Sequence, residues 1–265
     1  MKRAFRLARF AAAAFLCVLA NVVMAQVPAQ EPLQRASAAL RLPVLAERMA
    51  KLHAQIGQGI LAQRSRRALA ETARDFDATL RAALSAAPTA EARENYVLLS
   101  LLWHEYRDWA QRAPTREGTR KLRERAEEVV WVAAKGARMF QEHSRAGLSG
   151  SVVRAEQAAL LSQRIPKLYL WRRWDIRDDA AAKELREAQE NLRRALEALR
   201  TAPDNTPEIE AELQVADNQL RFMDDAARQL DVRHDSRHLE FIAKAGDHIL
   251  ESMERAARLY VAARP

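Results

Sequence analysis

Residues 154 to 174 read RAEQAALLSQRIPKLYLWRRW, a stretch that combines apolar residues at helical spacing with two cations, Arg164 and Lys167. A shorter form of the pattern, LAERMAKLH, occupies residues 45 to 53. Its cations, Arg48 and Lys51, precede Arg164 and Lys167 by 116 residues. The apolar residues match at the same spacing, since Leu161, Ile165 and Leu168 correspond to Leu45, Met49 and Leu52. This repetition predicts that one structural unit occurs twice in the chain.

The spacing of apolar residues predicts a helical protein. In the first unit Leu42, Leu45, Met49, Leu52 and Ile56 recur in steps of three and four, which is typical of one face of an α-helix. The chain of 265 residues holds only 7 glycines, and most of its 9 prolines lie at the edges of the apolar repeats. Long helices joined by short turns are therefore expected.

Turn residues divide the chain into helices. Gly57 and Gly59 interrupt the first apolar repeat, Thr89 can cap a third helix, and Pro114 ends it. The second half repeats this order, with corresponding apolar residues displaced by 116 to 120 positions and with Pro207 in the first turn of a helix.

From this order we predict an all-α protein made of tandem duplicated antiparallel four-helix bundles, with units at residues 26–146 and 147–265. The join from His143 to Ser151 is either bent or a continuous helix. Separate bundles and one continuous core both stay open, and so does the oligomeric state, including a homodimer.

The N-terminus predicts export. Four cations precede an apolar run over residues 10–20, and the small residues Val23 and Ala25 follow it. This order is typical of a signal peptide, here residues 1–25 with cleavage after Ala25. A retained membrane anchor is the alternative, but the apolar stretch is shorter than the roughly 20 residues that span a bilayer. We therefore expect a periplasmic mature protein. The four cations are Lys2, Arg3, Arg6 and Arg9.

Composition argues against several classes of function. Loss of the predicted signal peptide lowers the formal net charge from +8 to +4, with acids and bases interspersed, so no nucleic-acid partner is expected. The single cysteine, Cys17, lies within the signal peptide.

His234 and His238 have the spacing of two metal ligands on one helical turn, but an exposed charged turn is the preferred interpretation. No catalytic constellation is visible, so we expect no enzyme, no metal and no cofactor.

The run from Leu161 to Arg164, with Lys167 and Tyr169 after it, resembles a box in periplasmic sensory domains of type IV pilus methyl-accepting chemotaxis transducers and nitrate-sensing histidine kinases. That box reads, roughly, Gly-Arg-Gln-Arg-Met-Leu-Ser-Gln-Arg-x-x-Lys. The resemblance implies a ligand-sensing four-helix domain that drives a cytoplasmic output. Here Glu156 stands at the glycine of the box and Ala159 at its inner arginine. No kinase or methyl-accepting segment is present, so a membrane-bound receptor or another periplasmic protein is the expected partner.

The repeated cations form the candidate ligand site. Arg164 and Lys167 lie three residues apart, on one helical face, where they could bind a small anionic ligand such as a carboxylate or an oxyanion. Arg48 and Lys51 repeat this arrangement. The alternative is that both pairs lie beside the apolar face and pair with glutamates of neighbouring helices.

The end of the same helix is a candidate interaction surface. Trp171, Arg172, Arg173 and Trp174 combine aromatic and cationic side chains, which suits an acidic partner or a ring-bearing ligand. Alternatively, one tryptophan closes the core and the other packs on an arginine.

The sequence thus favours a secreted sensory or ligand-binding module that acts through a partner. The alternatives are a structural or interaction protein without a small ligand and, more weakly, a carrier of a small cofactor or metal.

Overall fold

The regular secondary structure of the protein is helical throughout the part that the structure, a computed structural model, describes: residues 27–143, 148–176, 180–233 and 235–263. The prediction of an all-α protein is confirmed, whereas the predicted signal peptide lies outside these residues. Within them the chain forms eight helices: α2 (Val27–Gly57), α3 (Ala62–Ser85), α4 (Ala90–Gln111), α5 (Arg116–His143), α6 (Gly150–Arg173), α7 (Ala181–Arg200), α8 (Pro207–Arg233) and α9 (Ser236–Ala262).

Local sequence explains where these helices begin and end. The hydroxyl of Thr89 accepts a hydrogen bond of 3.1 Å from the backbone N–H of Ala92, which caps α4 as predicted. Ser149 caps α6 in the same way through the N–H of Val152. Because α5 ends at His143 and α6 begins after this cap, the join is not a continuous helix. Gly59, with φ of +71°, makes the turn after α2.

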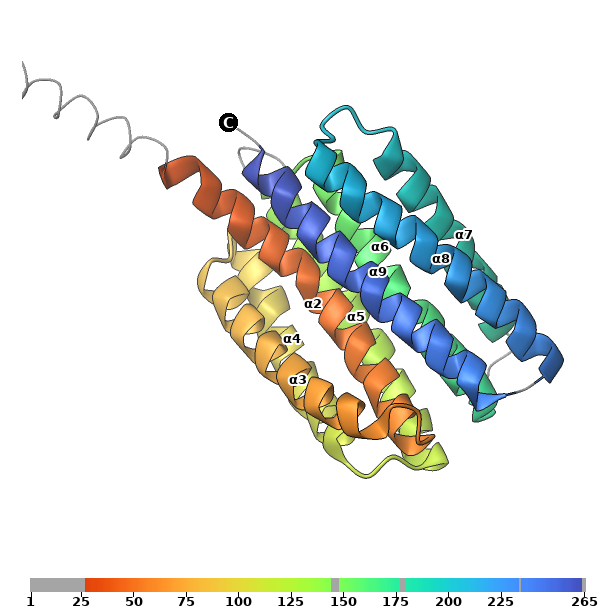
Figure 1. The fold of residues 1–265 in the computed structure, drawn as a ribbon. Coiled ribbons are helices and arrows are strands. Elements are labelled where there is room, and N and C mark those ends of the chain that lie inside the picture. Colours follow the sequence, from red (N-terminus) through yellow and green to blue (C-terminus); the bar gives the residue numbers. More distant parts are fainter. Residues whose placement is uncertain (1–26, 144–147, 177–179, 234, 264–265) are drawn as a thin grey trace, which may run out of the picture.

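The helices are arranged in two groups that meet along α2 and α6. In the first group α2 contacts α3 and α5, and α4 contacts α5 and α3; in the second group α6 contacts α7 and α9, and α8 contacts α9 and α7. Contact between the groups runs mainly through α2 and α6, with a smaller contribution from α2 and α9. Figure 1 shows α2 beside α9, with α3 and α4 on one side and α7 and α8 on the other.

This arrangement makes α2 and α6 central helices. Every residue from 42 to 55 is buried except Arg48, and every residue from 161 to 171 is buried except Arg164. The apolar face predicted for these helices was therefore too narrow, because each helix has neighbours on several sides. The two exceptions are the matching arginines of the repeated stretch.

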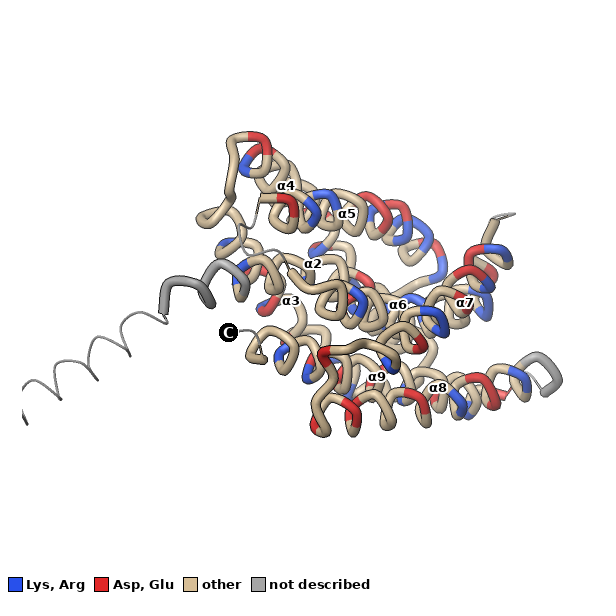
Figure 2. The backbone as a smooth tube through the Cα atoms, turned by 90° about the horizontal axis from the view of Figure 1, so that it is seen from above, with Lys and Arg blue, Asp and Glu red and all other residues tan. Residues whose placement is uncertain are grey.

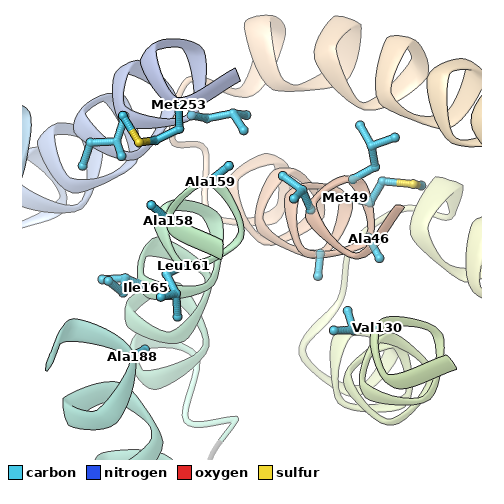
Figure 3. Packing of buried hydrophobic residues seen from close by; sticks show 14 of the residues in the cluster. Ala46, Met49, Val130, Ala158, Ala159, Leu161, Ile165, Ala188 and Met253 are labelled. Carbon is cyan, nitrogen blue, oxygen red and sulfur yellow. The ribbon is translucent and has the colours of Figure 1, made fainter. Parts of the chain in front are cut away.

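Small side chains line the centre of the core. Alanines are frequent among the buried residues of α2 and α6, which allows helix backbones to approach closely. One contiguous apolar cluster includes residues of all eight described helices. Figure 3 shows part of it, with Ala46 and Met49 on α2 and Ala158 and Ala159 on α6.

A glycine permits the close contact between α6 and α9. Pro166 lies inside α6 and has no N–H to donate to the carbonyl of Ser162, four residues earlier. Gly246 of α9 sits against this point, where a Cβ atom would overlap the Ser162 carbonyl and lie 2.8 Å from Cγ of Pro166. Its own carbonyl accepts a hydrogen bond of 2.9 Å from Nε2 of Gln163. A side chain at position 246 would therefore push the two helices apart.

Charged residues cover the outside of the structure. Figure 2 shows acidic and basic residues interleaved along the outer helices. Many form exposed ion pairs, such as that of Arg125 with Glu105 at 3.0 Å, which contribute little stability each. Within the described ranges, none of the helices combines the length and apolar character needed to cross a bilayer.

Candidate functional site

Charged side chains lie within the centre of the structure, where α2 and α6 meet the other helices. Glu47, Lys51 and Lys167 are each at most 1 % exposed. An unpaired charge in such a place costs several kcal/mol, so each group needs a partner of opposite charge. The partners come from helices far away in the sequence.

Glu47 of α2 is held by both candidate cations of α6. Nζ of Lys167 lies 2.6 Å from Oε2 of Glu47, and Nε of Arg164 donates to Oε1 at 2.8 Å. Arg164 also lies 3.8 Å from Glu184 of α7. Burial by itself raises the pKa of Glu47. The positive charges of Lys167 and Arg164 lower this pKa by more than burial raises it, so the resulting pKa lies below the ordinary value. Glu47 is therefore a carboxylate that neutralises cations of the opposite group of helices.

Lys51, the counterpart of Lys167, has a different partner. It forms a buried ion pair with Asp247 of α9. Burial raises the pKa of Asp247, but Lys51, followed by Arg48 and Arg64, brings it below the ordinary value. Three cations thus act on one carboxylate at this place.

Arg48 is the least compensated of the four predicted site residues. Its side chain is half-buried, and its buried Nε atom has no hydrogen-bond acceptor among the described residues. The structure therefore separates the candidate residues into two clusters. Arg164 and Lys167 surround Glu47, whereas Arg48 and Lys51 lie near Asp247.

The predicted interaction surface at the end of α6 does not form one exposed patch. Trp171 is 1 % exposed, and its ring lies under Nζ of Lys167, 4.3 Å from the ring centre. Trp174 is half-buried and packs over Gly57, where a Cβ atom would overlap the indole ring. Arg172 and Arg173 are exposed. Both tryptophans thus close one end of the helices, beside a cavity of about 410 Å³ that Trp171 and Arg172 help to line.

No family model, curated protein or solved structure matches this chain.

A second charged cavity lies where α2, α6 and α9 meet, with a volume of about 330 Å³. Its charged lining consists of Arg41, Glu156, Glu254 and Arg258. Nη2 of Arg41 donates to Oε1 of Glu254 at 3.0 Å. Glu156 is only 5 % exposed, and its Oε2 atom has no hydrogen-bond donor among the described residues. Burial raises the pKa of Glu156 to about 8, although the nearby Arg41 opposes this.

Sequence reasoning offered glutamates of neighbouring helices as partners of the cations, and Glu47 and Glu184 are such partners, but it did not identify which acidic residues would be buried. Glu47 stands directly before Arg48 in the quoted repeat, yet nothing in the local pattern shows that it is buried. Glu156 drew attention only as a departure from the sensory-domain box. Its position among the buried residues Val152, Ala155 and Ala159 of α6 is the signal that could have identified it.

The histidine pair considered as a metal site is only partly described. His234 lies outside the described residues, and the ring of His238, on α9, lies 6.3 Å from that of Phe241. In the described part of the chain, no three His, Cys, Asp or Glu side chains are grouped so that they could hold a metal ion.

Proposed function

We propose that the protein is a secreted, non-catalytic ligand-binding module of the sensory type, which acts through a membrane-bound receptor or another periplasmic protein. In this proposal α2 to α5 and α6 to α9 are two copies of a four-helix unit, joined through their first helices. The repeat spacing of 116 residues and the parallel set of helix contacts support the duplication. The box that resembles chemotaxis-transducer and nitrate-sensor domains supports the sensory role.

The observation that carries the proposal is an unequal charge balance between the two copies. Arg164 faces the carboxylates of Glu47 and Glu184. At the spacing of 116 residues, the positions equivalent to Glu47 and Glu184 are Gln163 and Ala68, and neither can carry a charge. Arg48, the counterpart of Arg164, therefore lacks both acidic partners.

A small anion would correct this imbalance. The guanidinium of Arg48 is half-buried, and Arg64 and Lys51 add positive charge around the single carboxylate of Asp247. A planar guanidinium recognises a carboxylate or an oxyanion through paired hydrogen bonds, which are strong when partly shielded from water. Because α2 contacts α6, an anion at Arg48 is placed to change the contact between the two units, and a ligand shifts such an equilibrium by its difference in affinity for the two states.

The test is anion-dependent stabilisation of the full-length mature protein, measured as the melting temperature in sulfate, nitrate and acetate. A ligand at 100 times its dissociation constant adds about 2.7 kcal/mol of stability. We expect Arg48→Gln to remove this stabilisation and Arg93→Gln, an exposed arginine of α4, to retain it. Arg164→Gln should lower the melting temperature without abolishing the anion response. An unchanged response in Arg48→Gln would refute the anion site.

Exposed apolar side chains favour a second candidate, a helical interaction protein without a small ligand. Leu101 of α4 and Trp131 of α5 are 68 % and 62 % exposed, and Phe222 of α8 and Phe241 of α9 are 61 % and 53 % exposed. Such side chains are common at protein interfaces. If a second copy covers them, the protein should dimerise in sedimentation equilibrium and become monomeric in a Trp131→Gln, Phe241→Gln variant. A monomer that binds anions would instead favour the first candidate.

Export is part of the proposal and has its own test. Mass spectrometry of the periplasmic fraction should find a mature chain that begins near Gln26. Recovery of the intact chain from the membrane fraction would contradict the proposed signal peptide.

A further inference from the structure

The cavity between α2, α6 and α9 holds unsatisfied groups of both signs. Oε2 of Glu156 is buried and accepts no hydrogen bond among the described residues, and Nε of Arg41 is buried and donates none. Arg258 is exposed at the same cavity, and no hydrogen bond or ion pair to another described residue is found for it. Glu254 is already paired with Arg41. The groups available to a ligand are thus one carboxyl group and two guanidinium N–H faces.

We propose that this cavity binds a small zwitterion of the α-amino-acid class, with its ammonium group at Glu156 and its carboxylate at Arg258 and the free Nε of Arg41. This site goes beyond the anion site at Arg48, from which it differs in residues and in ligand chemistry.

The charge balance favours a zwitterion over a simple ion. The four charged side chains of the lining, two acidic and two basic, compensate one another when all are ionised. A simple anion would leave Glu156 in its protonated form, without the cation that its carboxylate needs, and would add negative charge near the carboxylate of Glu254. A simple cation would leave the guanidinium groups without an acceptor. A zwitterion satisfies both kinds of group, and buried polar groups without partners are costly.

The remaining lining determines the size of the ligand. Ala38, Val261 and Ala262 contribute apolar surface, and a volume of about 330 Å³ suits a small aliphatic side chain. Arg41 comes from the first group of helices and the other charged groups come from the second. A bound zwitterion would therefore link the two groups.

Ligand binding should release a proton. Burial holds Glu156 largely protonated at neutral pH, since its pKa is about 8, with Arg41 and Arg258 opposing this shift and Glu254 supporting it. An ammonium group beside Glu156 favours the carboxylate form. The heat of binding at pH 7 should therefore depend on the ionisation enthalpy of the buffer.

The experiment is calorimetric titration of the full-length mature protein with three matched probes. L-valine carries both charges, isobutylamine is its counterpart without the carboxylate, and 3-methylbutanoate is its counterpart without the ammonium. We expect valine to bind at least tenfold more tightly than either single-charge probe. Absence of valine binding, or equal binding of valine and isobutylamine, would overturn the proposal without the use of any variant.

Variants assign the two ends of the ligand. Glu156→Gln and Arg258→Gln should each weaken valine binding at least tenfold, and Glu156→Gln should also abolish the buffer dependence. Glu251→Gln, an exposed acid on the same helix as Glu254, is the matched control and should bind valine normally. Arg48→Gln should also leave valine binding unchanged, which separates this site from the anion site. Normal valine binding in Glu156→Gln would overturn the assignment.

Discussion

Nζ of Lys167 on α6 lies 2.6 Å from Oε2 of Glu47 on α2, and both side chains are at most 1 % exposed. This contact joins the two groups of helices through their central members. The buried pair of Lys51 on α2 and Asp247 on α9 also joins the two groups. Here the first group supplies the cation and the second group supplies the carboxylate. Each group thus buries a charge whose partner belongs to the other group.

Removal of one member of this pair should be strongly destabilising. Lys167→Met leaves Glu47 buried with Arg164 as its only close cation among the described residues, and we expect a loss of about 3 kcal/mol in the free energy of unfolding. Urea denaturation measures this loss. The matched control is Lys183→Met, whose exposed partner is Glu187, and it should cost less than about 1 kcal/mol. Equal losses in the two variants would show that the buried pair contributes no more to the free energy of unfolding than an exposed pair.

The reciprocal pairs also predict that the two groups of helices depend on one another. Fragments of residues 26–146 and 147–265 should each be helical by circular dichroism but less stable than the intact chain, because each exposes the surface that α2 and α6 bury together. When mixed, they should form a one-to-one complex in light scattering. Fragments that do not associate, and that have the same melting temperature as the intact chain, would show two independent bundles.

Glu156 predicts a pH dependence of stability. Its folded pKa of about 8 lies above the ordinary glutamate pKa of 4.5, so the folded state holds more protons than the unfolded state between these values. Stability at this site is therefore fully present below pH 4.5, falls as the pH rises, and reaches its minimum above pH 8. The glutamine side chain of the Glu156→Gln variant cannot ionise. The stability of this variant relative to that of the wild type should therefore rise between pH 5 and pH 9.

The size of this relative gain follows from the pKa difference. At about 1.4 kcal/mol for each pKa unit, it should amount to a few kcal/mol in urea denaturation. Glu251→Gln should follow the wild type at every pH. Parallel pH profiles of Glu156→Gln and the wild type would refute the buried, unpaired state of Glu156.

The contact of Gly246 with α6 predicts a steric effect. Gly246→Ala places a Cβ atom against the Ser162 carbonyl and Pro166, which cannot move independently of the α6 backbone, so we expect a loss of about 1–3 kcal/mol. Gly150→Ala is the control, because its Cβ would meet only the end of the flexible Arg154 side chain. The control should be neutral or stabilising in thermal unfolding, since alanine favours the helix. Similar melting temperatures for the two variants would contradict the tight contact.

The sequence by itself determined the helices of this protein. Apolar spacing and the cap at Thr89 act within a few residues, so they can be recognised without knowledge of the fold. The same reasoning identified the cation pairs, because a repeat is visible in the sequence alone.

Only the tertiary structure decided what those cations contact. Arg48 and Arg164 occupy equivalent places in the repeat, yet Arg164 pairs with Glu47 and Arg48 finds no acceptor for its Nε atom among the described residues. The same holds for Glu156, which is buried through the approach of α2 and α9. Burial and pairing of a charge depend on side chains that distant helices bring within a few ångströms, and no local pattern contains that information.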